Sequence, residues 1–137
     1  MASSQGAAGR RPRILVSLPP SSVRDTFLPP QVVARLEAAG QVTWNEEPGA
    51  LQPDDLADRL PGVDVCVTGW GAPRFDARVL AGADRLGLVA HTGGSVAAIV
   101  SDELFNRGIR VVSGNRVFAE SVAESVVAYA LLALRRL

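Results

Sequence analysis

The chain has no lysine, one cysteine and one histidine among its 137 residues, and its formal net charge is zero. Without lysine, P-loop phosphate binding and Schiff-base chemistry are excluded. The single cysteine, Cys66, cannot form an internal disulfide or a multi-cysteine metal site, so we expect a reducing cytoplasm as its setting. The 14 basic and 14 acidic residues are spread evenly. With no basic stripe to follow a phosphate backbone, nucleic acid is not an expected partner.

Long hydrophobic runs are also scarce. The apolar run that follows Arg10 and Arg11 ends at Pro19, which is too early for an export signal. Near the other end, residues 126–134 are almost wholly apolar but cover only about half of the roughly 20 residues that a membrane helix requires. We therefore expect no membrane partner.

The pattern that is present indicates one α/β domain. Residues 1–12 lack periodic apolar positions and are expected to form a disordered tail. From Arg13 onward, short apolar runs alternate with helix-like stretches, which is typical of βαβ units around a parallel sheet. These runs are rich in Val, Ile and Leu, as in strands that are covered on both faces. The predicted strands are residues 14–18, 42–44, 64–68, 86–91 and 109–113.

Helices are predicted between these strands and at the end of the chain. The signals include proline at helix starts, glycine after helix ends, and Ser101 as an N-cap. The last predicted helix, from about Ala119, is apolar around most of its circumference and so needs cover on several sides. We divide the chain into a domain over residues 13–118 and a linking helix over residues 119–137. The other predicted helices are residues 31–39, 53–60, 76–81 and 101–107.

Ligands of open parallel sheets bind at the carboxyl ends of the strands. Here those ends are residues 17–22, 69–73, 92–96 and 114–118. The most informative segment is 91–96, His-Thr-Gly-Gly-Ser-Val, because two glycines allow close approach of backbone N–H groups to a carboxylate or phosphate. A plain chain reversal is the alternative interpretation of Gly93 and Gly94. The segment does not match the G-x-G-x-x-G dinucleotide fingerprint.

Other conspicuous residues have simpler interpretations. His91 is the only histidine, and without a carboxylate to orient it a structural role is favoured over a catalytic one. Trp44 and Trp70 are interpreted as core or cleft-wall aromatics rather than as a recognition pair. The acidic pairs at residues 46–47 and 54–55 lack metal-loop spacing and are expected to form a solvated face. No metal site is expected.

Three segments together resemble the D-2-hydroxyacid dehydrogenases, a family that includes phosphoglycerate, glycerate/hydroxypyruvate and formate dehydrogenases. They are residues 88–96 (LVAHTGGSV), residues 106–111 (NRGIRV), and residues 121–124 (SVAE) followed by 131–134 (LLAL). The resemblance covers residues 13–137. It implies a flavodoxin-like five-stranded parallel sheet with flanking helices, ending in a long apolar C-terminal helix.

The resemblance also implies roles for particular residues. Backbone N–H groups of Gly93, Gly94 and Ser95 would hold the substrate carboxylate, and Trp70 and Gly71 would face the same cleft. Val122 would lie at the start of a helix that enters the cofactor domain near the nicotinamide, in a region that commonly takes part in dimer contacts.

Two departures from the family pattern limit what this chain is expected to do. Ala97 occupies a place where the family usually has Asp, and the chain stops before the dinucleotide turn and the catalytic Arg, Glu and His. No catalytic residue is therefore assigned. We expect the substrate-binding portion of an NAD(P)-dependent enzyme that acts on a small 2-hydroxy or 2-oxo acid. The complete enzyme would bind NAD or NADP and form a homodimer, whereas this chain alone would bind no cofactor and be inactive.

Two alternatives remain open. The chain could be a stand-alone flavodoxin-like binding or interaction module, such as a signalling receiver or a cobalamin- or flavin-binding domain. A receiver needs acidic residues after the first strand and a later lysine, whereas this chain has Ser17-Leu18-Pro19 and no lysine; the cobalamin pattern D-x-H-x-x-G is missing around His91. The second alternative is a truncated relative kept as a partner or dimerisation decoy. The sequence does not distinguish it from the substrate-binding portion of an enzyme.

Overall fold

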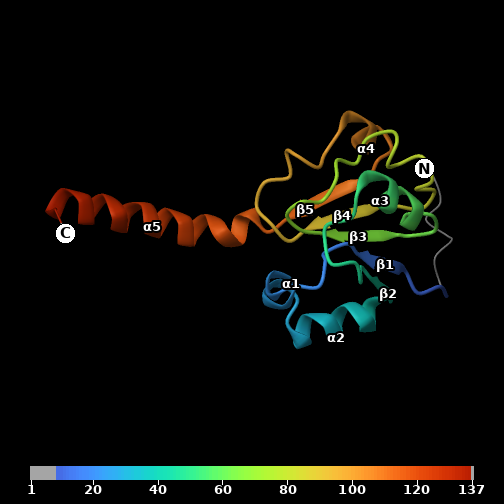
Figure 1. Cartoon of the computed structure of the whole chain (residues 1–137), viewed down its shortest axis with the longest axis horizontal. Helices are drawn as coiled ribbons and strands as arrows, with labels where there is room; N and C mark the ends of the chain where they lie inside the picture. Colours follow the sequence, from blue (N-terminus) through green and yellow to red (C-terminus); the bar gives the residue numbers. More distant parts are fainter. Residues whose placement is uncertain (1–8, 137) are drawn as a thin grey trace.

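The computed structural model describes residues 9–136 and contains one five-stranded sheet in the order β2-β1-β3-β4-β5 (Figure 1). All four strand pairings are parallel. The predicted parallel sheet is thus confirmed, and every strand ends within two residues of its predicted position. The strands are β1 (Arg13–Val16), β2 (Gln41–Trp44), β3 (Val65–Thr68), β4 (Leu88–His91) and β5 (Arg110–Ser113). The predicted tail lies mostly in residues 1–8, outside the described residues.

Five helices accompany the sheet: α1 (Ser22–Phe27), α2 (Pro30–Ala39), α3 (Pro53–Arg59), α4 (Asp102–Asn106) and α5 (Asn115–Arg135). The capping prediction for α4 is confirmed, since the Leu104 N–H donates to Ser101 Oγ at 3.1 Å. Helix α1 was not predicted. It begins after Ser21, whose hydroxyl accepts from the Arg24 N–H, and it is too short to show an apolar period. Helix α5 starts at Asn115, four residues before the predicted Ala119.

The helix predicted over residues 76–81 is wrong, because this segment forms consecutive turns. One helical-type bond is present, from the Leu80 N–H to the Asp76 carbonyl at 2.9 Å. The Asp76 carboxylate accepts from the Val79 N–H at 3.0 Å, and such side-chain bonds compete with a regular helix. Val79 and Leu80 are fully buried, so packing holds the turns in place.

Helices cover the sheet on both faces, as Figure 1 shows: α3 and α4 lie on one side, and α1 and α2 on the other. Because side chains alternate along a strand, β1 serves both cores. Leu15 packs in the core with Leu56 of α3 and Leu104 of α4, while Ile14 and Val16 pack in the core on the α1–α2 side. The expectation of cover on both faces is right for β1 but wrong for the edge strand β5, where Val112 is 53% exposed.

Helix α5 projects away from the body, and none of its described residues is buried (Figure 1). The predicted long apolar helix is therefore confirmed, and it lacks the cover that its composition requires. Its mean hydropathy reaches 1.7, so by length and composition α5 could cross a membrane, a test that core helices of soluble proteins also pass. The apolar run at residues 126–134, on which the sequence-based expectation depended, is only part of this 21-residue helix. The absence of a membrane partner stays a prediction.

Candidate functional site

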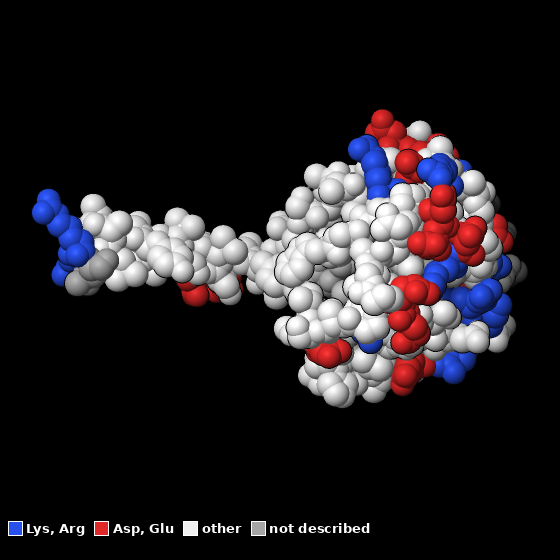
Figure 2. Space-filling view, in the orientation of Figure 1, with Lys and Arg blue, Asp and Glu red and all other residues white. Residues whose placement is uncertain are grey.

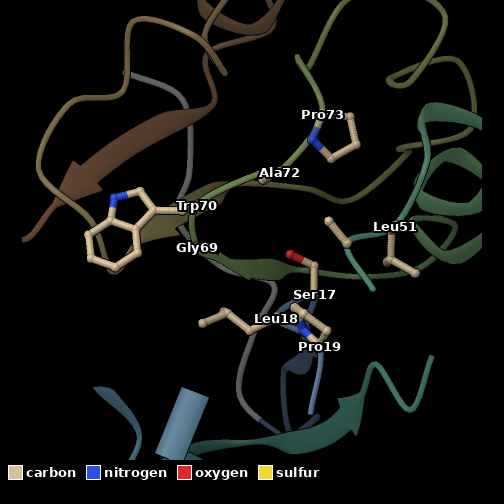
Figure 3. A pocket seen from close by; sticks show the side chains of 9 residues that line it. Ser17, Leu18, Pro19, Leu51, Gly69, Trp70, Ala72 and Pro73 are labelled. Atoms are coloured by element: carbon tan, nitrogen blue, oxygen red, sulfur yellow. The ribbon is translucent and has the colours of Figure 1, made fainter. Parts of the chain in front are cut away.

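The candidate site lies at the carboxyl edge of the sheet, where the loops after β1 and β3 separate. Strand β2 lies on one side of β1 and β3 on the other, so this is the point at which the direction of winding reverses. A pocket opens here between the loops that follow three strands (Figure 3). The residues that line it are Ser17, Leu18 and Pro19 after β1, Ala50 and Leu51 after β2, and Gly69, Trp70, Ala72 and Pro73 after β3.

Asn45 ties two of these loops together, and the sequence analysis missed it. Its side chain is fully buried, and its Nδ2 donates to the Ser17 carbonyl at 3.2 Å and to the Gly49 carbonyl at 3.1 Å. Ser17 is held from the other side, since its N–H donates to the Val67 carbonyl at 2.9 Å. A buried amide directly after a strand was the available signal.

The glycine loop follows β4 and leaves three successive backbone donors free. The Thr92 N–H still donates to the Thr68 carbonyl at 2.8 Å, which extends the β3–β4 ladder by one residue. Beyond it, the N–H groups of Gly93, Gly94 and Ser95 have no acceptor among residues 9–136. Successive free N–H groups of this kind are suited to bind an anion.

His91 ends β4 and is 5% exposed. Its Nδ1 lies 3.0 Å from Oγ1 of Thr68, which is fully buried on the neighbouring strand. Burial lowers the pKa of His91 below its ordinary value of 6.5, so the ring is neutral at physiological pH. The orienting partner that the sequence did not reveal is therefore a hydroxyl rather than a carboxylate.

Trp70 stands at the mouth of the pocket and is 64% exposed. Its ring meets Phe27 of α1 edge to face, with 5.4 Å between centroids, and Phe27 meets Phe118 of α5 in the same way at 5.9 Å. Trp44 lies elsewhere, in the core on the α1–α2 side, with the Arg24 guanidinium 5.6 Å from its ring centroid. Trp44 therefore packs against the core, whereas a cleft-wall role for Trp70 stays a prediction.

His91 at the end of β4 and Trp70 in the loop after β3 meet beside Gly93. A Cβ built there would lie 2.6 Å from Nε2 of His91 and 2.8 Å from Nε1 of Trp70. At Gly94 a Cβ would lie 3.2 Å from Oδ1 of Asn115, the first residue of α5. The structure thus brings Gly93, Gly94 and Trp70 together.

The remaining predicted site residues have different surroundings. Gly71 follows Trp70 with φ +81°, a conformation that favours glycine, and its Cβ position faces Ala50. Ser95 is exposed at the end of the glycine loop. Val122 lies in α5, away from the loops, and is 59% exposed. Nothing in the described residues contacts it in a way that defines a site.

The site is poor in charge. None of the nine pocket-lining side chains is ionisable in the physiological range, and Figure 2 shows acidic and basic side chains gathered on the part of the body away from α5. Within residues 9–136, no group of three or more His, Cys, Asp or Glu side chains could hold a metal ion. The polar groups available here are backbone and neutral side-chain donors and acceptors.

Comparison with known proteins adds the family context. The family model for the D-isomer specific 2-hydroxyacid dehydrogenase catalytic domain matches residues 22–130. No curated protein matches the chain.

Solved structures resemble the chain over most of its length. A protein from Pyrococcus horikoshii OT3 is 20% identical with a TM-score of 0.72 and covers 93% of this chain and 34% of its own. A phosphoglycerate oxidoreductase from Rhizobium etli is 26% identical with a TM-score of 0.64, covering 89% and 36%. The pyruvate reductase of Chlamydomonas reinhardtii is 21% identical with a TM-score of 0.61, covering 90% and 34%. The chain therefore spans about a third of the length of these structures.

Proposed function

The chain belongs to the D-isomer specific 2-hydroxyacid dehydrogenase family, and on that premise we propose that it is the substrate-binding part of an NAD(P)-dependent oxidoreductase acting on small 2-hydroxy and 2-oxo acids. One observation carries the proposal. The N–H groups of Gly93, Gly94 and Ser95 have no acceptor among the described residues, and they follow β4 at the carboxyl edge of the sheet. A substrate carboxylate supplies the acceptors that these donors lack.

The residues of this chain would bind and orient the acid rather than carry out the reaction. The backbone donors would fix the carboxylate, while Leu18, Leu51 and Trp70 belong to the apolar lining of the pocket at the same edge of the sheet. Fixing the carboxylate at one end limits the orientations in which the adjacent carbon is presented. Such positioning is the contribution of a substrate domain to hydride transfer.

The described residues do not fit a dinucleotide. The turn after β1 contains Ser17, Leu18 and Pro19 rather than glycine. Gly69-Trp70-Gly71 after β3 comes nearest to the fingerprint, but Arg74 stands in place of the third glycine and no helix follows directly. We therefore assign NAD or NADP, which would accept the hydride, to a cofactor-binding domain that is separate from these residues.

Helix α5 would connect to that cofactor domain in the complete enzyme. Its exposed apolar residues, Val122 among them, match a helix that is covered by another domain or by a second subunit. We extend the proposal to a cytoplasmic homodimer for the complete enzyme. The family resemblance and the free, buried Cys66 support this extension.

Titration of the ¹⁵N-labelled chain with pyruvate tests the carboxylate assignment. We expect saturable amide shifts at residues 93–95, with a Kd of about 1–10 mM for so small a ligand. Methyl pyruvate, which has the same pyruvoyl group but a neutral ester in place of the carboxylate, serves as the control and should leave these amides unmoved. Shifts confined to other loops, or equal shifts with the ester, would contradict the assignment.

A further inference from the structure

The side chains of His91 and Trp70 converge on one face of Gly93. Nε2 of His91 and Nε1 of Trp70 both lie within 2.8 Å of the point where a side chain of residue 93 would begin. The two groups come from different strands, β4 and the loop after β3. Since residue 93 is glycine, no side chain of its own separates the two nitrogens.

The hydrogen bonding of His91 determines what its Nε2 offers. The Thr68 hydroxyl is fully buried, and Nδ1 of His91 is its partner among the described residues. A buried hydroxyl that donates to Nδ1 requires the tautomer with its proton on Nε2. Burial lowers the pKa of the ring and favours this neutral form.

Nε2 is a polar atom that still needs a partner. No group in residues 9–136 hydrogen-bonds it, although His91 is only 5% exposed. No fully buried side-chain nitrogen or oxygen in the described residues lacks a partner, so Nε2 must reach solvent. The indole Nε1–H of Trp70 is a donor only and likewise bonds to none of the described residues.

We propose that His91 Nε2–H and Trp70 Nε1–H form a pair of neutral donors that binds an oxygen of the substrate carboxylate, next to the backbone N–H groups of the glycine loop. This inference rests on the proposed function and deepens it. It makes His91 a substrate-binding residue, oriented by Thr68, where the sequence favoured a structural role.

The surroundings of the pair narrow the substrate class to short, unphosphorylated acids. A carboxylate needs few donors, whereas a phosphate dianion is usually met by Arg or Lys side chains. The pocket-lining residues provide no cation, and its walls are the apolar side chains of Leu18, Leu51 and Trp70.

Replacing His91 by asparagine and by glutamine tests the roles of its two ring nitrogens separately. His91→Asn retains a group near the Nδ1 position, beside Thr68, and loses the donor toward Gly93. His91→Gln places an amide nitrogen near the Nε2 position and retains that donor. Trp70→Phe removes the indole N–H but keeps an aromatic ring beside Phe27, and since Trp70 is largely exposed this variant should fold normally.

Pyruvate titration of each folded variant, followed by NMR, tests the proposal. We expect His91→Asn and Trp70→Phe each to weaken binding about tenfold, the effect of losing one hydrogen bond to a charged acceptor. His91→Gln should stay within about threefold of the unmodified chain. The indole resonance of Trp70 should move on titration, whereas that of Trp44, the other tryptophan, should not.

The outcomes distinguish this inference from the proposed function. If pyruvate moves the amides of residues 93–95 but Trp70→Phe and His91→Asn bind it as well as the unmodified chain, the donor pair is wrong and the carboxylate loop stands. If pyruvate moves none of these amides, both fail. D-glycerate and 3-phospho-D-glycerate differ by the phosphate alone, and tenfold tighter binding of the phosphorylated acid would overturn the substrate class.

Discussion

Oγ1 of Thr68 lies 3.0 Å from Nδ1 of His91, and the two residues are register partners on the adjacent strands β3 and β4. The contact holds a neutral imidazole at the carboxyl edge of the sheet. Because burial lowers the pKa of His91, the unfolded chain binds a proton more readily than the folded chain. The ionisation of one side chain is thus linked to folding.

The first prediction concerns pH. Stability from the neutral His91 is fully present above its ordinary pKa of 6.5 and is lost as pH falls below that value toward the lower folded pKa. Chemical denaturation between about pH 7.5 and pH 5.5 should show this loss in the unmodified chain and a flatter profile in His91→Gln. Asp64, whose pKa is lowered from 3.8, titrates at lower pH and does not mask the effect. Parallel profiles for the two chains would refute the prediction.

The second prediction concerns Gly93. A methyl group there meets His91 and Trp70 at 2.6 Å and 2.8 Å, so Gly93→Ala should move one of these rings and cost about 1–3 kcal/mol of stability. Gly49→Ala is the matched control, because a Cβ at Gly49 has no neighbour within 4 Å. Thermal denaturation measures both variants. Equal stability of the two would show that the glycine loop has room to spare.

The third prediction concerns Gly94, where an added side chain would have more room than at Gly93. A Cβ at Gly94 lies 3.2 Å from Oδ1 of Asn115, a side chain at the start of α5 that can rotate. Gly94→Val should therefore fold, while its larger side chain crowds the backbone donors and weakens pyruvate binding about tenfold. NMR titration measures this loss. Unchanged affinity in a folded Gly94→Val chain would argue against the carboxylate loop.

The fourth prediction concerns Cys66. Burial raises the pKa of its thiol to about 12, against a partly compensating hydrogen bond to Ser17. Since the thiolate is the reactive form, iodoacetamide at about pH 8 should leave the folded chain unmodified and alkylate it only after denaturation. Ser125→Cys on the exposed helix α5 provides a reactive control. Rapid alkylation of native Cys66 would reveal frequent opening of the core.

The fifth prediction concerns α5. Its exposed apolar side chains should make the chain self-associate, because uncovered apolar surface of this extent is unusual on a soluble monomer. Val127→Glu with Leu131→Glu should shift sedimentation toward the monomer, since both residues line the same apolar surface of α5. Ser121→Glu with Ser125→Glu adds the same charge at polar positions and should have less effect. A monomeric unmodified chain would contradict the prediction.

Strands β1, β3 and β4 were predictable because their residues are mainly β-branched or aliphatic and are mostly buried or half-buried. The turns at residues 76–81 were not, because the Asp76 carboxylate bonds the backbone there and no periodicity reveals that choice. The glycine loop was evident from two adjacent glycines. The hydrogen bond between Thr68 and His91 depends on the register of β3 and β4. The two residues are 23 positions apart, and the local sequence does not reveal that register.

Other parts of the site depend on contacts between distant segments. Phe27 belongs to a six-residue helix that the sequence did not indicate, yet it is the aromatic residue that contacts both Trp70 and Phe118. Leu51 reaches the pocket from the loop after β2, on the far side of β1. Such residues become recognisable only once the order of the strands is known.

The geometry of α5 makes it a lever. Its 21 residues extend for about 30 Å at 1.5 Å per residue, so a rotation of about 10° at its base displaces the far end by about 5 Å. The fulcrum is Gly114, whose N–H donates to the carbonyls of His91 and Gly93 at 3.1 Å and 2.9 Å. A domain or subunit that binds the outer turns of α5 and rotates it would therefore strain the backbone of the glycine loop.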